Sequence, residues 1–314
     1  MEFRHLGRSG VQVSTLGLGG NNFGARIDEE QSARVLQKAI DLGVNFVDTA
    51  DVYSNGLSES FIGAALAGQR HQVILATKVG SPVGQGVNQG GASRSYIMQQ
   101  VEGSLNRLRT DYIDLYQIHL PDPGTPIEET LRALDDLVHQ GKVRYIGCSN
   151  FLSWQTCEAV WISHTLNLAN FVTVQMEYSL LNHDIEREVV PFCQAYRIGI
   201  IPYFPLAGGL LTGKYRPGEP VSEGTRFFTV PKYKERFLTE RNFSLVARLE
   251  RFASDRGHTL SELAIAWLLG NPLVCSVITG AMKPEQLVAN AKGAEWHLTS
   301  REMEDIKALL HPQE

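Results

Sequence analysis

Cysteine is scarce in this chain, and its scarcity excludes the small folds that disulfides hold together. Four cysteines occur in 314 residues, and they show no CxxC spacing: Cys148, Cys157, Cys193 and Cys275. A disulfide framework needs a denser and more regular set, so we expect a soluble protein of a reducing, cytoplasmic compartment. Because neither HExxH nor a clustered His/Cys spacing occurs, no metal site is predicted.

Long apolar runs and a strong charge of one sign are also missing. No apolar run approaches 18 residues, the length that a membrane-spanning helix needs. Residues 1–5 lack the charged-then-apolar layout of a secretory signal. The formal net charge is −5, from 29 basic and 34 acidic side chains. We therefore expect neither a nucleic-acid partner nor a membrane partner.

What the chain does have is a regular alternation of short apolar runs with longer amphipathic segments. The runs rich in Ile, Val, Leu and Tyr predict strands at 14–19, 44–48, 73–78, 112–118, 143–148, 172–176, 198–203 and 274–279. The segments between them predict helices at 29–42, 58–68, 93–108, 127–140, 153–164, 184–196, 260–269 and 284–292. This alternation predicts a parallel sheet, either closed into a barrel or open and doubly wound.

Eight strand–helix units in a chain of this length favour closure. We predict an α/β protein, a (β/α)8 TIM barrel, with one domain over residues 1–314. An N-terminal β-hairpin is expected at 3–6 and 11–14, and extra helices are expected near the C-terminus at 242–257 and 299–310. The walls of the pocket are expected from the loops near 21–24, 80–92 and 206–240.

Four polar residues lie at or just past the ends of three successive predicted strands: Asp48, Tyr53, Lys78 and His119. Taken singly, each has an ordinary explanation: a helix cap or ion pair, a packing aromatic, a solvent-reaching lysine and a hydrogen-bonded core histidine. Taken together they indicate a site, because the carboxyl ends of barrel strands converge on one face.

An acid, a phenol, an amine and an imidazole on one face can carry out proton transfer to a carbonyl oxygen. A free tyrosine has a pKa near ~10, which makes it a poor acid-base catalyst at neutral pH. A nearby ammonium stabilises the phenolate and lowers that pKa, while an aspartate keeps the ammonium charged and in place. The imidazole can orient or polarise the substrate oxygen.

At these residues the chain resembles the aldo-keto reductase superfamily, and the matching motifs follow one another along almost its whole length. They are Phe46–Tyr53 with Gly56–Glu59, Ala76–Lys78, Asp114–His119, Gly141–Phe151, Gln175 with Glu177–Ser179, Tyr203–Leu206 and Gly209–Tyr215. The resemblance implies an (α/β)8 barrel that binds a nicotinamide cofactor and reduces carbonyl compounds. It places a catalytic tetrad at Asp48, Tyr53, Lys78 and His119, with Tyr53 as the proton donor.

The resemblance also implies where the cofactor lies. Its nicotinamide end would contact Ser149, Asn150, Gln175 and Tyr203, although Ser149 and Asn150 could instead cap a helix. Its pyrophosphate would contact Pro205, Leu206, Gly208, Lys214 and Arg226. Its adenosine end would contact Gly280, Met282, Lys283, Gln286 and Asn290. The expected cofactor is NADPH, with NADH still open, because Lys283 is the only cation of this last group.

Two glycine-rich stretches fail as nucleotide motifs. Asn22 replaces the third glycine of a GxGxxG pattern, and Tyr215 replaces the Ser/Thr of a P-loop. The expected function is NAD(P)H-dependent reduction of a small-molecule aldehyde or ketone. One alternative is a cofactor-binding regulator that resembles the β subunits of voltage-gated potassium channels. A lyase or aldolase acting through a Lys78 Schiff base is a weaker third interpretation.

Overall fold

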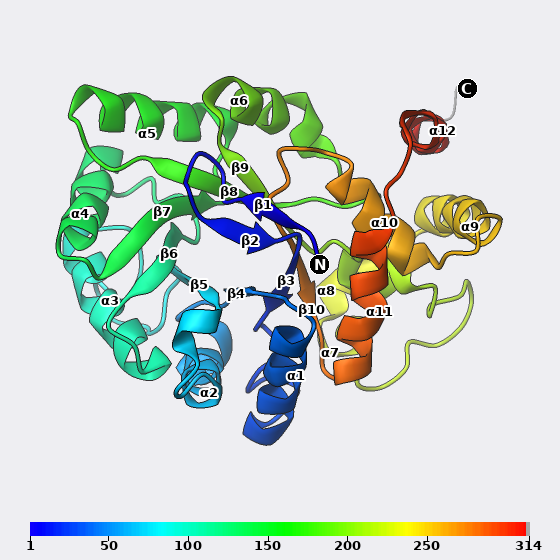
Figure 1. The fold of residues 1–314 in the computed structure, drawn as a ribbon, viewed down its shortest axis with the longest axis horizontal. Coiled ribbons are helices and arrows are strands. Elements are labelled where there is room, and N and C mark those ends of the chain that lie inside the picture. Colours follow the sequence, from blue (N-terminus) through cyan, green and yellow to red (C-terminus); the bar gives the residue numbers. More distant parts are fainter. Residues whose placement is uncertain (312–314) are drawn as a thin grey trace.

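Eight parallel strands curl into a barrel in the computed structural model, which describes residues 1–311 (Figure 1). They are β3 (Leu16–Gly19), β4 (Phe46–Asp48), β5 (Ile74–Val79), β6 (Ile113–Ile118), β7 (Val143–Ser149), β8 (Phe171–Glu177), β9 (Gly199–Tyr203) and β10 (Val277–Gly280). The sheet order is β10-β3-β4-β5-β6-β7-β8-β9. Ile200 closes the ring, donating to the Leu273 carbonyl at 2.8 Å and accepting from the Cys275 N–H at 2.9 Å. The predicted (β/α)8 barrel is confirmed.

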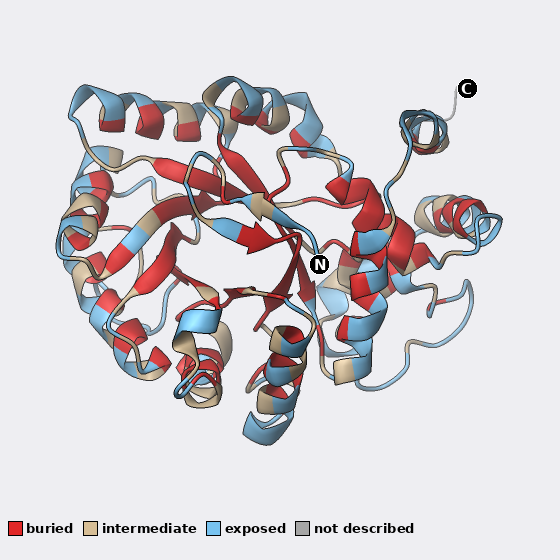
Figure 2. Cartoon of the chain, in the orientation of Figure 1, coloured by how far each residue is buried: buried red, intermediate tan, exposed pale blue. Residues whose placement is uncertain are grey.

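Helices pack around the outside of the barrel, and their apolar faces turn inward (Figure 2). One follows each strand: α1 (Glu29–Asp41), α2 (Leu57–Ala65), α3 (Arg94–Leu108), α4 (Ile127–His139), α5 (Ser153–Thr165), α6 (Val189–Tyr196), α10 (Leu260–Leu269) and α11 (Pro284–Glu295). Several begin at side-chain caps that the sequence supplies, such as Asp28 before α1 and Thr259 before α10. Such caps bond N–H groups that the first turn leaves free.

The predicted N-terminal β-hairpin is present, and it lies across one end of the barrel. Its strands are β1 (Phe3–His5) and β2 (Gln12–Ser14), and it crosses the barrel in Figure 1. Leu6 and Val13 are fully buried and belong to the hydrophobic cluster of the barrel interior. The hairpin therefore plugs the amino-terminal end of the barrel. The predicted extra helices are confirmed as α9 (Glu240–Ser254) and α12 (Ser300–Leu310).

Two predicted segments differ from the structure. The helix expected at 184–196 is a 3-10 turn, η3 (Asp184–Arg187), followed by α6. The segment expected as a loop at 206–240 contains η4 (Ala207–Thr212), α7 (Arg226–Thr229) and α8 (Pro231–Phe237). Two further 3-10 turns are η1 (Tyr53–Gly56) and η2 (Arg70–Gln72). Helices this short carry too few residues to show a periodic pattern.

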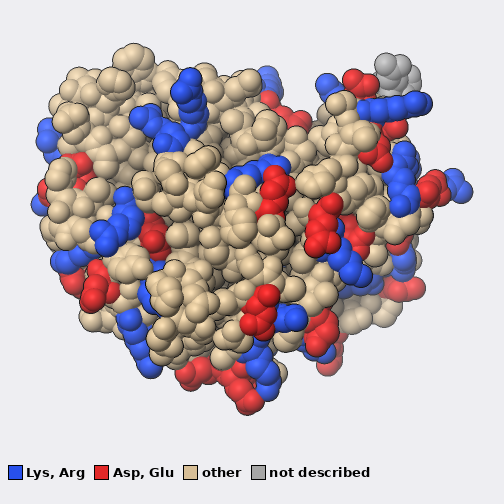
Figure 3. All heavy atoms as spheres, in the orientation of Figure 1, with Lys and Arg blue, Asp and Glu red and all other residues tan. Residues whose placement is uncertain are grey.

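Two features of the structure concern its surface charges and the length of its apolar helices. On the face drawn in Figure 3, acidic and basic side chains are interspersed rather than gathered by sign. Within residues 1–311, no helix is both long and apolar enough to cross a membrane.

Side chains alternate between the two faces of each strand, and this alternation places the polar residues inside the barrel. Phe46, Ala76 and Leu115 belong to the interior cluster of β4, β5 and β6. Residues two positions further along a strand face the same side. Asp48, Lys78 and Gln117 occupy those positions, at the carboxyl-terminal end, and all three are buried.

Candidate active site

A cavity of about 800 Å³ opens at the carboxyl-terminal end of the barrel strands. This volume lies in the range typical of small-molecule sites. Of the predicted tetrad, Asp48, Tyr53 and His119 line it, while Lys78 lies buried behind them. The predicted cofactor residues that line it are Ser149, Asn150, Gln175, Tyr203, Pro205, Leu206, Gly208, Lys214, Arg226, Gly280, Met282, Gln286 and Asn290.

Lys78 is the centre of the tetrad. Its ammonium donates to Asp48 Oδ2 at 2.6 Å and to the Thr49 carbonyl at 2.8 Å. It also reaches the Tyr53 hydroxyl at 3.3 Å. The other Asp48 oxygen accepts from Gln175 at 2.8 Å and from Gln117 at 3.3 Å. The acid, the amine and the phenol therefore form one connected chain, as the strand-end positions predicted.

Burial and neighbouring charges compete in setting the pKa values of Lys78 and Tyr53. Burial alone would lower the pKa of Lys78, but the adjacent Asp48 and Tyr53 outweigh it and raise that pKa above its ordinary value. Burial also raises the pKa of Tyr53, and Lys78 opposes the rise without reversing it. The expectation of a net lowered tyrosine pKa is therefore wrong for this structure, because desolvation of the phenolate outweighs the ammonium. Tyr53 stays protonated at neutral pH.

His119 directly follows β6 and lies beside Tyr53, with their ring centroids 5.8 Å apart in an edge-to-face arrangement. Burial, followed by the charge of Lys78, lowers the pKa of His119 to about 3. Its Nδ1 is buried, with no hydrogen-bond partner among residues 1–311. The imidazole is thus neutral across the physiological range and can act as a hydrogen-bonding group.

The residues predicted to hold the nicotinamide end form a connected group. Ser149 donates to the Gln175 carbonyl at 2.9 Å. The Asn150 amide donates to the His119 carbonyl at 3.0 Å, and its oxygen accepts from the Tyr203 hydroxyl at 2.7 Å. The capping alternative is wrong, because the N-cap position of α5 is Leu152. The amide groups are therefore held in fixed orientations at the cavity wall.

Three cations gather along the cavity without an acidic partner. Arg26, Lys214 and Arg226 all line it, and none makes an ion pair within residues 1–311. Burial, and then the positive charges of Arg26 and Arg226, lower the pKa of Lys214. Clustered cations that repel one another gain stability when an anion joins them. This end of the cavity suits a phosphate-bearing ligand.

The turn η4 is shaped around one of these cations. Gly208 and Gly209 have φ of 65° and 103°, in the left-handed region that favours glycine. A Cβ on Gly209 would lie 2.9 Å from the Lys214 ammonium nitrogen. The glycine at this position leaves room for the lysine.

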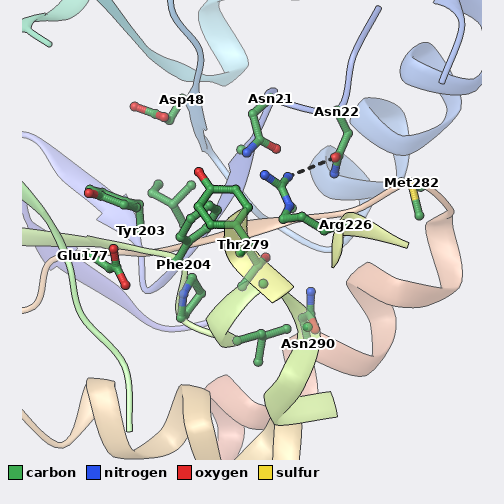
Figure 4. A pocket seen from close by; sticks show the side chains of 18 of the residues that line it. Asn21, Asn22, Asp48, Glu177, Tyr203, Phe204, Arg226, Thr279, Met282 and Asn290 are labelled. Carbon is green, nitrogen blue, oxygen red and sulfur yellow. Dashed lines mark hydrogen bonds between the residues drawn. The ribbon is translucent and has the colours of Figure 1, made fainter. Parts of the chain in front are cut away.

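One of the residues predicted to contact the adenosine end lies apart from the others. Met282, Gln286 and Asn290 line the cavity, but Lys283 is exposed and lies outside its lining. The Gln286 side chain accepts from the Met282 N–H at 2.7 Å, at the start of α11. Figure 4 shows Arg226 pointing toward Asn22, whose side-chain oxygen accepts from it at 3.3 Å.

Some predictions about the cavity wall are wrong or incomplete. No residue of 80–92 lines the cavity, and Ala92 at the end of this segment is hydrogen-bonded to Asp122 and Thr130. Asn21, Tyr233 and Arg236 line it from the predicted wall segments 21–24 and 206–240, whereas Arg26, Glu177 and Phe204 line it without a predicted role. Glu177 of β8 forms a bidentate ion pair with Arg236 of α8, at 2.6 and 2.9 Å. Their separation along the chain leaves no local signal.

The fold and the site define a barrel protein with an acid–amine–phenol chain beside a phosphate-suited cavity. A family model described as the aldo/keto reductase family, a family of oxidoreductases, matches residues 15–311. The chain belongs to this family.

Relatives match it over nearly their whole lengths. The chain is 39% identical, over 99% of its length and 97% of the relative, to a "Probable voltage-gated potassium channel subunit beta" of Oryza sativa subsp. japonica. It is 36% identical, over 99% of its length and 94% of the relative, to "Aldo-keto reductase YhdN" of Bacillus subtilis. It is also 38% identical to the Bacillus subtilis "Uncharacterized oxidoreductase YrpG", over 94% and 91% of the two chains.

Proposed function

We propose that this protein is an NADP(H)-dependent reductase of aldehydes and ketones. The observation that carries the proposal is the Asp48–Lys78–Tyr53 chain, which ends in a protonated phenol at the cavity. We also propose that residues 1–314 are one domain and that the protein is cytoplasmic.

The residues present fit a nicotinamide cofactor. Ser149, Asn150 and Gln175 form a fixed polar wall beside Tyr53, suited to a carboxamide. The unneutralised cations Arg26, Lys214 and Arg226 suit the phosphates, since each forms charge-assisted bonds to such oxygens. When bound, the cofactor would supply the hydride that goes to the carbonyl carbon.

The chain's own residues would handle the proton. Tyr53 donates its phenolic proton to the carbonyl oxygen, and Lys78 stabilises the phenolate that remains. Asp48 keeps Lys78 charged and fixed in place, at 2.6 Å. His119, which is neutral, orients the carbonyl oxygen by hydrogen bonding. In the reverse direction, the phenolate takes the proton of an alcohol.

Turnover with a simple carbonyl compound tests the proposal. The purified protein is expected to consume NADPH in the presence of 4-nitrobenzaldehyde, as followed by the loss of cofactor absorbance. The rate should saturate with both cofactor and aldehyde, and alcohol should form in equal amount. Absence of turnover across a panel of aldehydes and ketones would contradict the proposal.

A second candidate function is favoured by the relatives named as potassium-channel β subunits, one of them 39% identical. In this alternative the protein binds the cofactor and serves mainly to regulate a partner. The complete tetrad is compatible with both functions. Slow turnover combined with very slow release of NADPH would favour the regulator, whereas fast multiple turnover would favour the reductase.

A further inference from the structure

The cavity lining contains one ion pair that the proposed reaction does not use, between Glu177 of β8 and Arg236 of α8. The Arg236 guanidinium donates to the two carboxylate oxygens of Glu177 at 2.6 and 2.9 Å. It also lies over the ring of Phe237, 4.8 Å from the ring centroid. Two hydrogen bonds and a ring contact give the guanidinium a defined orientation at the cavity wall.

This pair lies near the tetrad rather than at the expected adenosine end. Glu177 is the partner of Tyr203 in the register of β8 and β9. The Tyr203 hydroxyl donates to Asn150 at 2.7 Å, and the Asn150 amide donates to the His119 carbonyl at 3.0 Å. Figure 4 shows Glu177 and Tyr203 on the side of the cavity opposite Met282. A short series of neighbours therefore connects Glu177 to a residue of the tetrad.

An aromatic wall lies beside the pair. Tyr233 precedes Arg236 by three residues on α8, so the two side chains lie on one face of this helix, and both line the cavity. The Tyr233 ring packs edge-on against the ring of Phe204, with the centroids 5.3 Å apart. Neither the tetrad nor the expected cofactor contacts include these residues or Glu177. They can therefore form the wall against which the body of a carbonyl substrate lies.

The charge at this wall is balanced, unlike the charge elsewhere in the cavity. Arg26, Lys214 and Arg226 make no ion pair within residues 1–311, and they suit the phosphates of the cofactor. The charge of Arg236, by contrast, is matched by Glu177. A free arginine fork binds carboxylates well. Here Glu177 already occupies the fork, and an incoming carboxylate would meet a group of like charge.

We propose that Glu177 is a specificity-determining residue, which neutralises Arg236 and thereby selects uncharged aldehydes and ketones over those that carry a carboxylate. This role rests on the proposed reductase function and narrows its substrate class. A group that repels the wrong ligand contributes to specificity as much as one that attracts the right ligand. The rings of Phe204 and Tyr233 suit the apolar body of an uncharged substrate.

The experiment compares the parent protein with Glu177→Gln, which keeps the shape of the side chain and removes its charge. The two substrates are 4-formylbenzoate, which carries a carboxylate, and 4-formylbenzamide, which has the same shape without the charge. The first readout is the ratio of their kcat/KM values at saturating NADPH. In Glu177→Gln this ratio should shift toward the carboxylate by at least about tenfold, the scale of a hydrogen bond to a charged group. The intrinsic reactivities of the two aldehydes cancel, because the same two substrates are compared in each protein.

Two further variants show whether the shift acts through Arg236. The double variant Glu177→Gln with Arg236→Met carries no charge at this wall, so the shift should disappear. Glu250→Gln is a matched control, because Glu250 forms the same kind of bidentate pair with Arg216, at 2.8 and 3.1 Å, outside the cavity lining. This control should keep the ratio of the parent.

The second readout needs no turnover, so it separates failure of this inference from failure of the reductase proposal. Calorimetry in the presence of NADP+ measures the binding of 4-carbamoylbenzoate and of terephthalamide, whose amide carbonyls take the place of the aldehyde and are not reduced. The ratio of the two Kd values should shift toward the carboxylate in Glu177→Gln and return in the double variant.

The two readouts have clear opposing outcomes. A shift toward the carboxylate that the double variant abolishes supports the role of Glu177. An unchanged ratio in Glu177→Gln would overturn it, and so would a shift that persists when Arg236 is also replaced. A parent protein that already prefers the carboxylate over the amide would overturn it as well.

Discussion

Asp48 shows how single side chains are fixed at this site. Its two oxygens accept from Lys78, Gln117 and Gln175, which come from three different strands. A buried carboxylate with three donors is satisfied, and it in turn keeps the Lys78 ammonium charged in a dry environment. Gln175 therefore has a role that the resemblance did not suggest: one end of its amide holds Asp48.

The first prediction concerns the proton donor. Tyr53→Phe removes the hydroxyl and keeps the ring, so we expect kcat to fall by at least about 10²-fold, the usual scale for losing a general acid. Cofactor affinity should change little. Steady-state kinetics with NADPH and 4-nitrobenzaldehyde measures both quantities.

A matched control is Tyr178→Phe. Tyr178 is also buried, but its hydroxyl donates to Glu186 at 2.6 Å, away from the cavity lining. This variant should lose stability rather than kcat. Near-normal kcat in Tyr53→Phe would show that a different group, His119 first, gives the proton.

The second prediction separates the chemical role of Lys78 from its structural role. Lys78→Met removes the ammonium, so the pKa of Tyr53 should rise further and alcohol oxidation should need a higher pH. The change also leaves Asp48 as an unpaired buried charge, which costs roughly 3–5 kcal/mol of stability. The pH profile of oxidation and the free energy of unfolding measure the two effects.

The double variant Asp48→Asn with Lys78→Met is the control for this prediction. It leaves no unpaired charge, so stability should return toward that of the parent while the altered pH profile remains. If the single variant keeps the parent's oxidation profile, Lys78 does not act on Tyr53.

At the scale of elements, the helices and strands that could be predicted are those with an apolar run or an amphipathic period in their own sequence. The helix predicted at 260–269 coincides with α10, and β7 and β9 differ from their predicted bounds by one residue. The proximity of Asp48, Tyr53, Lys78 and His119 was predictable for a related reason: strand ends can be read from apolar runs, and barrel geometry then brings them together.

The segment 206–240 shows no periodic pattern of apolar residues, and contacts with residues far away in the sequence hold it in place. The Arg26 guanidinium donates to the Gly224 carbonyl, and Arg226 donates to Asn22 at 3.3 Å. Arg236 pairs with Glu177 on β8. These contacts join residues far apart in the chain, so no local window of sequence encodes them. For the same reason, Arg26 and Glu177 were missed as lining residues.

The third prediction compares two cations at different elements. Arg226 lies in the cavity wall, so Arg226→Ala should weaken both NADPH and NADH, by roughly 1.5–3 kcal/mol for a charged hydrogen bond. Lys283 was expected to contact the adenosine end, where NADPH carries the 2′-phosphate that NADH lacks, but it is exposed and outside the lining. Lys283→Ala should therefore weaken NADPH by no more than about 1 kcal/mol.

Fluorescence titration with each cofactor at several salt concentrations measures these affinities. Added salt should weaken the contribution of Lys283 more than that of Arg226, because exposed charges are screened more strongly. A large, NADPH-specific loss in Lys283→Ala would show that this lysine turns into the cavity and holds the 2′-phosphate.

At the scale of the whole molecule, the barrel separates the site from the plug that closes its other end. The tetrad lies at the carboxyl ends of the strands, whereas the hairpin of β1 and β2 covers the amino ends. Arg4 fastens the hairpin by donating to the carbonyls of Leu269 at 2.9 Å and Val274 at 3.0 Å. Stability and catalysis should therefore respond separately to changes at the two ends.

The last prediction tests this separation with Leu6→Ala. Leu6 is fully buried in the barrel interior, so the truncation should leave a cavity and cost about 2–5 kcal/mol of stability. Phe3→Ala, on the same hairpin but 45% exposed, should cost much less and serves as the control. Thermal and denaturant unfolding measure stability, and kinetics below the Tm of each variant measures kcat and the KM for NADPH. Both kinetic constants should stay near those of the parent in both variants, because neither residue lines the cavity. A large change in kcat for Leu6→Ala, at a temperature where the variant is folded, would show that packing at the plug is coupled to the tetrad through the barrel interior.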